Sequence, residues 1–408
     1  MKNATRKFAL AALLAGVMAT PAFAGAQPDY QQVHDGHYQA ILGDCMGCHT
    51  SPGGKPFAGG AALQTPYGAF VPPNITPDAA TGIGNWSEEQ FRHAVKDGVG
   101  RGGQKLYPAM PYPNYAKMSD QDIANLYAYM QSVEPVQRNA GRNRLNFPYN
   151  FRSLMTVWNG LYLKTGPVEP VAGKSAAWNR GNAIVNGPAH CNTCHTPKSF
   201  LGADTSAALT GASLSGWFAP DITADKHGVG SWTVSDVVTY LKTGHNSHSM
   251  ASGPMAEAIS YSTSKMSDGD LNAIAVYLKD VPASGADAGS PLAKDDAHFK
   301  AGLEIYQDNC AACHGSDGKG ENALFPPLNG SPIIAQTSAE TLVRVVLAGT
   351  QSAQTKGNLT SPAMPSFAWR LNDAQVADVL SYVRGSWGNG GAVSAGAVAD
   401  QRKSIPRH

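Results

Sequence analysis

The sequence predicts an all-α protein that contains three tandem domains. Strand-like alternation of apolar and polar residues is sparse. In addition, short sequence segments of the first domain recur in the second. Residues 73–76 (PNIT) return as residues 220–223 (PDIT), and residues 117–120 (KMSD) return as residues 265–268 (KMSD). The first two domains are therefore close duplicates. The third is shorter and more divergent, but it keeps the same order of elements.

Each domain is expected to begin and end with an amphipathic helix. The N-terminal helix is clearest over residues 297–308, and the C-terminal helices are expected over residues 120–133, 268–281 and 373–384. Each C-terminal helix starts with a capping pair. The pair consists of the N-cap residue and the residue three positions later, whose side chains cap the first turn of the helix. These pairs are Ser119 with Asp122, Ser267 with Asp270, and Asn372 with Gln375. We expect the tyrosines at matching places on these helices to pack against the N-terminal helix: Tyr129, Tyr277 and Tyr382.

Six cysteines occur only as C-x-x-C pairs, and a histidine follows each pair at once. On a helical turn, residues i, i+3 and i+4 share one face, so two thiols can bond the two vinyl groups of one porphyrin while the imidazole reaches its iron. C-x-x-C-H is the attachment signature of c-type haem. The three motifs are Cys45, Cys48 and His49; Cys191, Cys194 and His195; and Cys310, Cys313 and His314.

Zinc sites, redox dithiols and secreted disulfides are the alternative uses of such pairs. Under each of them, the histidine adjacent to all three pairs would be a coincidence. The sequence thus predicts three covalently bound haem c groups, one in each of three class I cytochrome c-like domains.

A second axial ligand decides between electron transfer and ligand chemistry at a haem iron. After His314 the only methionine is Met364, within Ala-Met-Pro, and Met110 in the first domain lies in the same tripeptide. A methionine in a proline-framed loop differs from a core methionine on a helix stripe, so both are predicted to be iron ligands.

The second domain offers several candidates for the sixth ligand. Met255 is favoured because its distance from His195 along the chain nearly matches that from His49 to Met110. The nearby alternatives are Met250, His245 and His248. Met118 and Met266 directly precede helix caps and resemble hydrophobic staples. A haem iron with an imidazole and a thioether as its axial ligands favours the Fe(II) state. Such an iron has no open coordination position for peroxide or substrate, so no catalytic residue is predicted.

The N-terminal residues have the pattern of a signal peptide, with a basic head, an apolar run and a small-x-small site that puts the mature N-terminus at Gly25. Without this leader, 28 basic and 30 acidic residues remain. A surface that binds nucleic acid needs an excess of basic residues, so nucleic-acid binding is not expected. The expected organisation is signal peptide 1–24, cytochrome c domain 25–135, strap 136–173, cytochrome c domain 174–281, linker 282–292, cytochrome c domain 293–387 and disordered tail 388–408.

The strap at 136–173 interleaves arginines with aromatic residues. One interpretation is that it packs between the first two domains. The other is that it forms a docking surface for an acidic partner or a haem propionate. The residues concerned are Arg138, Arg142, Arg144 and Arg152, with Phe147, Tyr149, Phe151 and Trp158.

The mature chain resembles the three-haem cytochrome c subunits of bacterial membrane-associated dehydrogenases, which accompany alcohol, gluconate, sorbitol, fructose or glucose dehydrogenases. The resemblance covers essentially its whole length. Some of those subunits end in an apolar or amphipathic anchor, and residues 388–408 have no such pattern, so tight membrane attachment through them is not expected. The resemblance rests on residues 74–77 (NITP), 106–112 (LYPAMPY), 194–198 (CHTPK), 201–204 (LGAD) and 313–315 (CHG), the last leading to 325–328 (FPPL).

The resemblance implies that a separate catalytic subunit with FAD or pyrroloquinoline quinone oxidises an alcohol or sugar in the periplasm. This chain would pass the electrons to ubiquinone or a terminal oxidase at the periplasmic face of the inner membrane, with peripheral membrane contact. It also implies Met110, Met255 and Met364 as axial ligands. The alternatives are a haem peroxidase with one open iron, a free-standing carrier, and the acceptor subunit of a molybdenum-containing aldehyde or heteroaromatic dehydrogenase.

Overall fold

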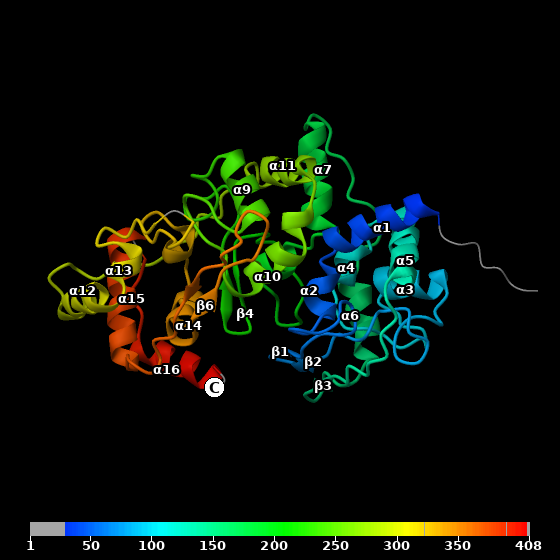
Figure 1. The fold of residues 1–408 in the computed structure, drawn as a ribbon, viewed down its shortest axis with the longest axis horizontal. Coiled ribbons are helices and arrows are strands. Elements are labelled where there is room, and N and C mark those ends of the chain that lie inside the picture. Colours follow the sequence, from blue (N-terminus) through cyan, green and yellow to red (C-terminus); the bar gives the residue numbers. More distant parts are fainter. Residues whose placement is uncertain (1–28, 322, 389, 406–408) are drawn as a thin grey trace, which may run out of the picture.

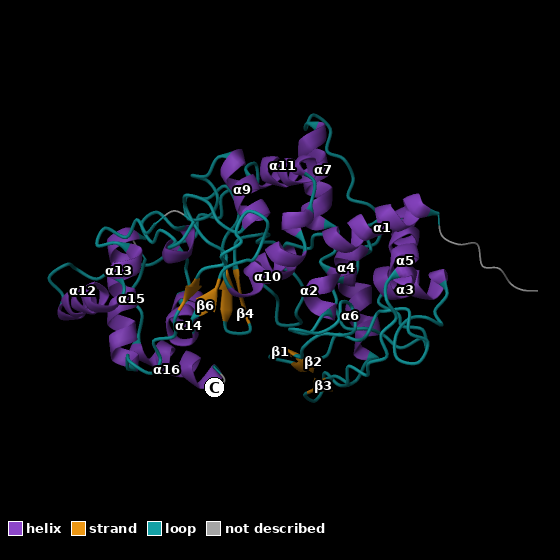
Figure 2. Ribbon diagram, viewed as in Figure 1, coloured by secondary structure: helices purple, strands orange, loops and turns teal. Residues whose placement is uncertain are grey.

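The computed structural model describes residues 29–321, 323–388 and 390–405. The predicted signal peptide lies outside these residues. Helices dominate, and the strands are short (Figure 2). Three blocks follow one another along the long axis, from the blue and cyan N-terminal block through the green middle block to the yellow and red C-terminal block (Figure 1). None of the helices in the described ranges has the length and apolar character needed to cross a membrane.

The first block surrounds a core that includes Phe91, Ile123 and Leu126. Its C-terminal helix begins where the sequence predicts, because the Ser119 hydroxyl accepts a hydrogen bond from the Asp122 amide. The elements are α1 (Tyr30–Leu42), α2 (Cys45–His49), β1 (Leu63–Thr65), β2 (Gly68–Phe70), α3 (Glu88–Asp97), α4 (Tyr112–Tyr115), α5 (Asp120–Ser132) and, from the strap, β3 (Arg144–Leu145), which pairs with β2.

The strap continues into α6 (Leu154–Tyr162) and leads to the middle block. There the Ser267 side chain caps α11 as predicted, by accepting from the Asp270 amide. The elements of the middle block are α7 (Ala176–Asn186), α8 (Asn192–His195), β4 (Ala212–Leu214), β5 (Trp217–Ala219), α9 (Val234–Thr243), α10 (Gly253–Tyr261), the 3₁₀ helix η1 (Thr263–Lys265) and α11 (Asp268–Leu278).

The third block repeats the order of the first two. Asn372 and Gln375 form the expected capping box at the start of α15. The elements are α12 (Ala297–Asn309), α13 (Ala311–His314), the 3₁₀ helix η2 (Pro332–Ala335), α14 (Glu340–Ala348), β6 (Thr350–Gln351), β7 (Ala363–Met364), α15 (Asp373–Trp387) and α16 (Ala395–Ser404).

A glycine in the first helix of each block allows the last helix to cross it closely. A Cβ atom built on Gly36, Gly181 or Gly302 would lie 1.8, 2.0 or 2.2 Å from a backbone carbonyl oxygen of α5, α11 or α15. It would also lie 2.8 Å from the Cβ atom of the tyrosine predicted to pack there, which is Tyr129, Tyr277 or Tyr382. The expected packing of the three tyrosines is thus confirmed.

The sequence prediction is incomplete in its strands. The pairs β1–β2, β4–β5 and β6–β7 are antiparallel, and none of these strands exceeds three residues. Alternation over two or three residues is too brief to stand out from loop sequence. The Ser215-Gly216 turn between β4 and β5 has positive φ at both residues, 50° and 82°, which suits the twist of a two-residue hairpin.

The expectation of a disordered tail is wrong for Ala395–Ser404, which forms α16 against α14 and α15. Val398 is fully buried in the core of the third block. Arg402 donates to Asp373 Oδ1 over 2.6 Å and to the carbonyl oxygens of Ala368 and Leu371. A single buried apolar side chain gives no periodic pattern, so the sequence of this segment looks like that of a polar tail. Its ordered structure comes from contacts with residues that are distant in the sequence.

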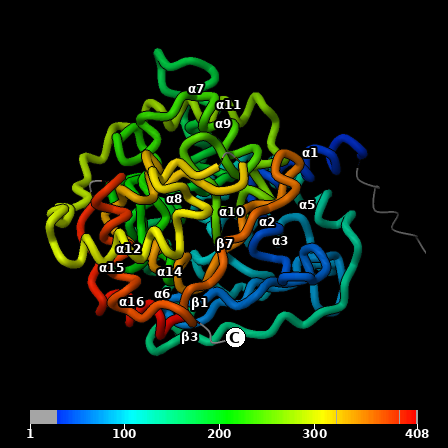
Figure 3. The backbone as a smooth tube through the Cα atoms, turned by 60° about the vertical axis from the view of Figure 1, so that its left-hand side comes forward, coloured from blue at the N-terminus to red at the C-terminus, as the bar shows by residue number. Residues whose placement is uncertain are grey.

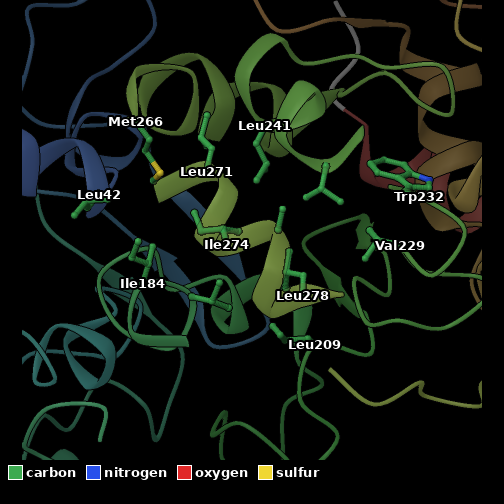
Figure 4. Packing of buried hydrophobic residues seen from close by; sticks show 13 residues of the cluster. Leu42, Ile184, Leu209, Val229, Trp232, Leu241, Met266, Leu271, Ile274 and Leu278 are labelled. Atoms are coloured by element: carbon green, nitrogen blue, oxygen red, sulfur yellow. The ribbon is translucent and has the colours of Figure 1, made fainter. Parts of the chain in front are cut away.

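The blocks are packed tightly against one another, and Figure 3 shows the same arrangement from a second side. Leu42, at the end of α1, belongs to the core of the middle block together with Ile184 and Met266 (Figure 4). On the other side, Thr341 of α14 and Phe218 of β5 exchange two hydrogen bonds, of 2.8 and 3.0 Å.

Candidate haem sites

Each C-x-x-C-H motif forms a single helical turn, in α2, in α8 with Cys191 at its N-cap, and in α13 with Cys310 at its N-cap. The amides of His195 and His314 bond the carbonyl oxygens of Cys191 and Cys310, four residues earlier. None of the six cysteines forms a disulfide. The turn therefore places two thiols and one imidazole on the same side of the backbone, which is the arrangement that the spacing predicts.

A proline carbonyl orients the histidine of each motif. The Nδ1 atom lies 2.7 Å from Pro73 O in His49, 2.7 Å from Pro220 O in His195, and 3.0 Å from Pro326 O in His314. Since a carbonyl oxygen only accepts, Nδ1 carries the proton and Nε2 keeps a free lone pair. Burial lowers the pKa of all three imidazoles, so they are neutral near pH 7. A neutral imidazole with a fixed Nδ1–H is the form that binds a metal through Nε2.

The motif thiols are poor candidates for nucleophiles. Burial raises the pKa of Cys45, Cys48 and Cys191 to about 12 and that of Cys310 to about 11. Reactive cysteines instead have a lowered pKa in an electropositive environment. The donor set fits covalent attachment of a porphyrin better than thiolate catalysis.

One apolar cavity connects the second and third motifs. Its volume is about 410 Å³, which lies within the roughly 300–1,000 Å³ of a pocket for one small molecule or cofactor. The cavity therefore has the size of an ordinary cofactor site. Its lining includes both motifs and the predicted methionines: Cys191, Cys194, His195 and Met255 from the middle block, and Cys310, Cys313, His314 and Met364 from the third block.

Three buried polar atoms of residues that line this cavity have no hydrogen-bond partner. These are the acceptors Asp44 Oδ1 and Asp221 Oδ2 and the donor Trp232 Nε1, and only the last supports the fit of a haem. A buried polar group without a partner is costly, so such atoms point to a missing ligand. A haem offers an acceptor for the indole N–H in its propionates, so Trp232 would help to hold it.

The sequence left four candidates for the sixth ligand of the haem iron in the second domain. Of these, Met250 and Met255 both line the cavity. His248 stacks on Trp232 with ring centroids 5.4 Å apart, and its Nε2 atom lies 3.5 Å from Asp236 Oδ2. Met255, in the first turn of α10, packs against both the middle core and the cluster of Ala251, Ala256, Ile259 and Ala353.

The other methionines fall into two groups. Met118 and Met266 are buried core residues, as the staple interpretation predicts. Met110 is half-buried and packs against a small cluster formed by Tyr112, Trp158 and Ala203. Its role as a ligand opposite His49 stays a prediction.

The strap lies between the first two blocks. Trp158 of α6 is buried, packs edge-on against Tyr112 and donates from Nε1 to the carbonyl oxygen of Leu201 over 2.9 Å. The Tyr112 hydroxyl in turn donates to Asn159 Oδ1 over 2.5 Å. The packing interpretation of this segment is therefore confirmed for its inner face.

Sequence reasoning missed a junction where the first two motifs meet. The Tyr115 hydroxyl donates to Gly43 O over 2.7 Å, and His190 Nε2 lies 3.3 Å from the same oxygen. His190 directly precedes Cys191, and its backbone has a positive φ of 40°. Asp44 directly precedes Cys45 with a φ of 46°, and burial raises its pKa to about 8. Both residues that precede these motifs have a positive φ, a backbone feature that the sequence does not show.

Comparison with known proteins shows the family of the chain. The family model for cytochrome c matches residues 22–134 and 299–387. The gluconate 2-dehydrogenase cytochrome c subunit of Pantoea cypripedii is 38% identical, over 96% of this chain and 94% of its own. The chain belongs to the cytochrome c family.

Other relatives of this cytochrome are also dehydrogenase subunits by name. The cytochrome c subunit of the quinone alcohol dehydrogenase of Gluconobacter oxydans is 37% identical over 92% of this chain and 83% of its own. The fructose dehydrogenase cytochrome subunit of Gluconobacter japonicus is 38% identical over 91% and 83%. Membership of the family implies covalently bound haem c in this cytochrome.

Proposed function

We propose that this cytochrome is an electron-transfer subunit with three haem c groups, one in each of three tandem class I domains. The observation that carries the proposal is the common cavity of the second and third motifs. Because both motifs line this one cavity, porphyrins attached to them would be neighbours, and an electron could pass between them without a mobile carrier.

Within this proposal, the cysteines of each motif hold a porphyrin and the motif histidine binds its iron. Haem iron held by imidazole and thioether supplies one-electron chemistry between Fe(III) and Fe(II). The Pro73, Pro220 and Pro326 carbonyls fix the imidazole rings. Met110, Met255 and Met364 would supply the second protein ligand of each iron. Trp232 would donate to a propionate, and the apolar lining would exclude water.

The proposed donor is a catalytic subunit with FAD or pyrroloquinoline quinone that oxidises an alcohol, sugar or sugar acid. The names of the three relatives support this class of partner. The proposed acceptor is ubiquinone or a terminal oxidase, at the periplasmic face of the inner membrane. Neither donor nor acceptor chemistry requires a catalytic residue in this chain.

The test is to mature the chain with haem and count the haem per chain by mass and by absorbance. We expect three, all low-spin, and no turnover of gluconate, ethanol or fructose by the isolated chain. Met364→Ala should turn about one third of the haem high-spin and open it to carbon monoxide. Met364→His should stay low-spin with a lowered potential, because imidazole raises the potential less than a thioether does.

Met118→Ala is the matched control, since Met118 is a buried core methionine, and its spectrum should not change. An unchanged low-spin spectrum in Met364→Ala would contradict the ligand assignment. Stoichiometric carbon monoxide binding by the unaltered, reduced protein would instead favour a haem enzyme with an open iron.

A further inference from the structure

The strap has an unbalanced charge. From residue 135 to residue 168 the chain carries five basic residues and no acidic one, in a protein whose basic and acidic residues nearly balance overall. Arg138 is used internally, because its guanidinium donates to the carbonyl oxygens of Ala58 and Gly59. The side chains of Arg142, Arg144, Arg152 and Lys164 are exposed. None of these four takes part in an ion pair among the described residues.

Helix α6 of the strap has two apolar faces, and only one of them is covered. Trp158 on the inner face is 8% exposed, whereas Val157 and Leu161 on the outer face are 65% and 62% exposed. Leu154, Val157 and Leu161 follow the i, i+3, i+7 spacing of a single helix stripe. An amphipathic helix of a monomeric globular protein would place polar residues along this outer stripe.

The apolar surface continues beyond the helix. Phe147 and Phe151 are 79% and 53% exposed, and their rings meet edge-on with centroids 6.0 Å apart. The Leu154 amide bonds the carbonyl oxygen of Phe151, which sets Phe151 one turn before the helix stripe. We call this surface the strap patch, and it consists of Phe147, Phe151, Leu154, Val157 and Leu161. The part of the strap next to β3 runs along the lower edge of the molecule in Figure 3.

We propose that the strap patch and its flanking basic residues bind the surface of an anionic lipid bilayer. Apolar side chains on an amphipathic segment insert at the boundary between headgroups and acyl chains, while basic side chains meet the anionic headgroups. The segment 135–168 that contains the patch carries basic and no acidic residues, which gives charge complementarity to a negative surface. This lipid contact goes beyond the electron-transfer proposal and does not depend on the number or ligation of the haems.

The experiment is co-sedimentation of the mature holoprotein with vesicles. One set contains equal parts of phosphatidylglycerol and phosphatidylcholine, and the other contains phosphatidylcholine alone. We expect binding to the first set, weakened at least about tenfold by about 0.5 M salt, and little binding to the second. Val157→Ser with Leu161→Ser should weaken binding at least about tenfold, and so should Arg142→Gln with Arg144→Gln and Lys164→Gln.

Matched controls lie in the third block. Leu303→Ser with Leu359→Ser removes two exposed leucines there, and Lys294→Gln with Lys300→Gln and Lys356→Gln removes three exposed charges. Both controls should bind vesicles like the unaltered protein. All variants should keep the haem spectrum, which shows that they fold.

Three outcomes would overturn the proposal. One is failure of the unaltered holoprotein to bind the anionic vesicles. Another is an equal loss of binding in the strap and control variants. The third is a strap variant that still binds vesicles but no longer co-purifies with a catalytic subunit, which would assign the patch to a protein partner.

Discussion

Asp270 is the residue that ties three helices together across a block boundary. Its carboxylate accepts from Arg180 Nε and Nη2 over 2.7 and 2.9 Å, and from the Tyr38 hydroxyl over 2.7 Å. Arg180 lies on α7 and Tyr38 on α1. Burial by itself would raise the pKa of Asp270, but the guanidinium and the hydroxyl outweigh it, so the pKa lies below its ordinary value of 3.8.

This lowered pKa predicts a pH dependence of stability. The unfolded state binds a proton at a higher pH than the folded state, so the contribution of Asp270 is complete above about pH 5 and is lost as the pH falls through the folded pKa. Asp270→Asn should lower the free energy of unfolding by about 2 kcal/mol at neutral pH. In urea titrations, this difference from the unaltered protein should shrink on acidification. A difference that is constant from neutral to acidic pH would contradict the assignment.

At the scale of elements, the first and last helices of each block owe their crossing to one glycine. Helix propensity alone would favour alanine at Gly181 by about 1 kcal/mol. Its retention is explained by the α7–α11 contact, where an added Cβ would meet Ala273 O at 2.0 Å. The clash would be between backbone atoms of the two helices, which cannot rotate away as a side chain can. The helices would therefore have to separate.

Gly181→Ala should therefore destabilise the protein, by about 2 kcal/mol after the gain in propensity. The matched control is Gly269→Ala in α11, where an added Cβ has no neighbour closer than 3.9 Å. That variant should be neutral or slightly stabilising. Thermal unfolding followed by circular dichroism separates the two, and equal melting temperatures would argue against the close crossing.

Helix α16 gives a second prediction at this scale. Val398→Ala removes a fully buried side chain and should cost about 2 kcal/mol, since each lost methylene costs about 0.8 kcal/mol and a cavity remains. Lys403→Ala, at an exposed position of the same helix, should change stability by less than about 0.5 kcal/mol. Denaturant titrations measure both. A disordered C-terminal segment would make the two variants indistinguishable.

At the scale of the whole molecule, the cores extend across the block boundaries. Leu42 of α1 is 1% exposed and packs in the core of the middle block. The Gln336 side chain, from the third block, accepts from the Asp221 amide and donates to His227 O in the middle block. The three blocks therefore hold one another in fixed positions, which would keep the proposed haems at fixed separations.

Leu42→Ala should destabilise the middle block although the residue lies in the first. We expect a loss of about 3 kcal/mol, typical of a buried leucine truncated to alanine. Hydrogen exchange should speed up at the amides of α7 and α11 as well as of α1. Faster exchange confined to α1 would show that the first two blocks unfold independently.

The sequence by itself determined the local features of this protein. The C-x-x-C-H turns, the capping pairs of α5, α11 and α15, and the tyrosines on those helices follow from short spacings, because a helical turn fixes the geometry of residues three and four apart. The core placement of Met118 and Met266 could also be predicted, from their position just before a cap.

Only the tertiary structure decided which residues that are distant in the sequence contact one another. It brings Pro73, Pro220 and Pro326 to the motif histidines, merges the second and third motif sites into one cavity, buries Val398 and leaves half of α6 uncovered. A backbone carbonyl has no residue-type signature, and a cavity wall is assembled from segments more than a hundred residues apart. Sequence spacing carries information about neighbours along the chain, whereas burial depends on which surfaces meet in the folded molecule.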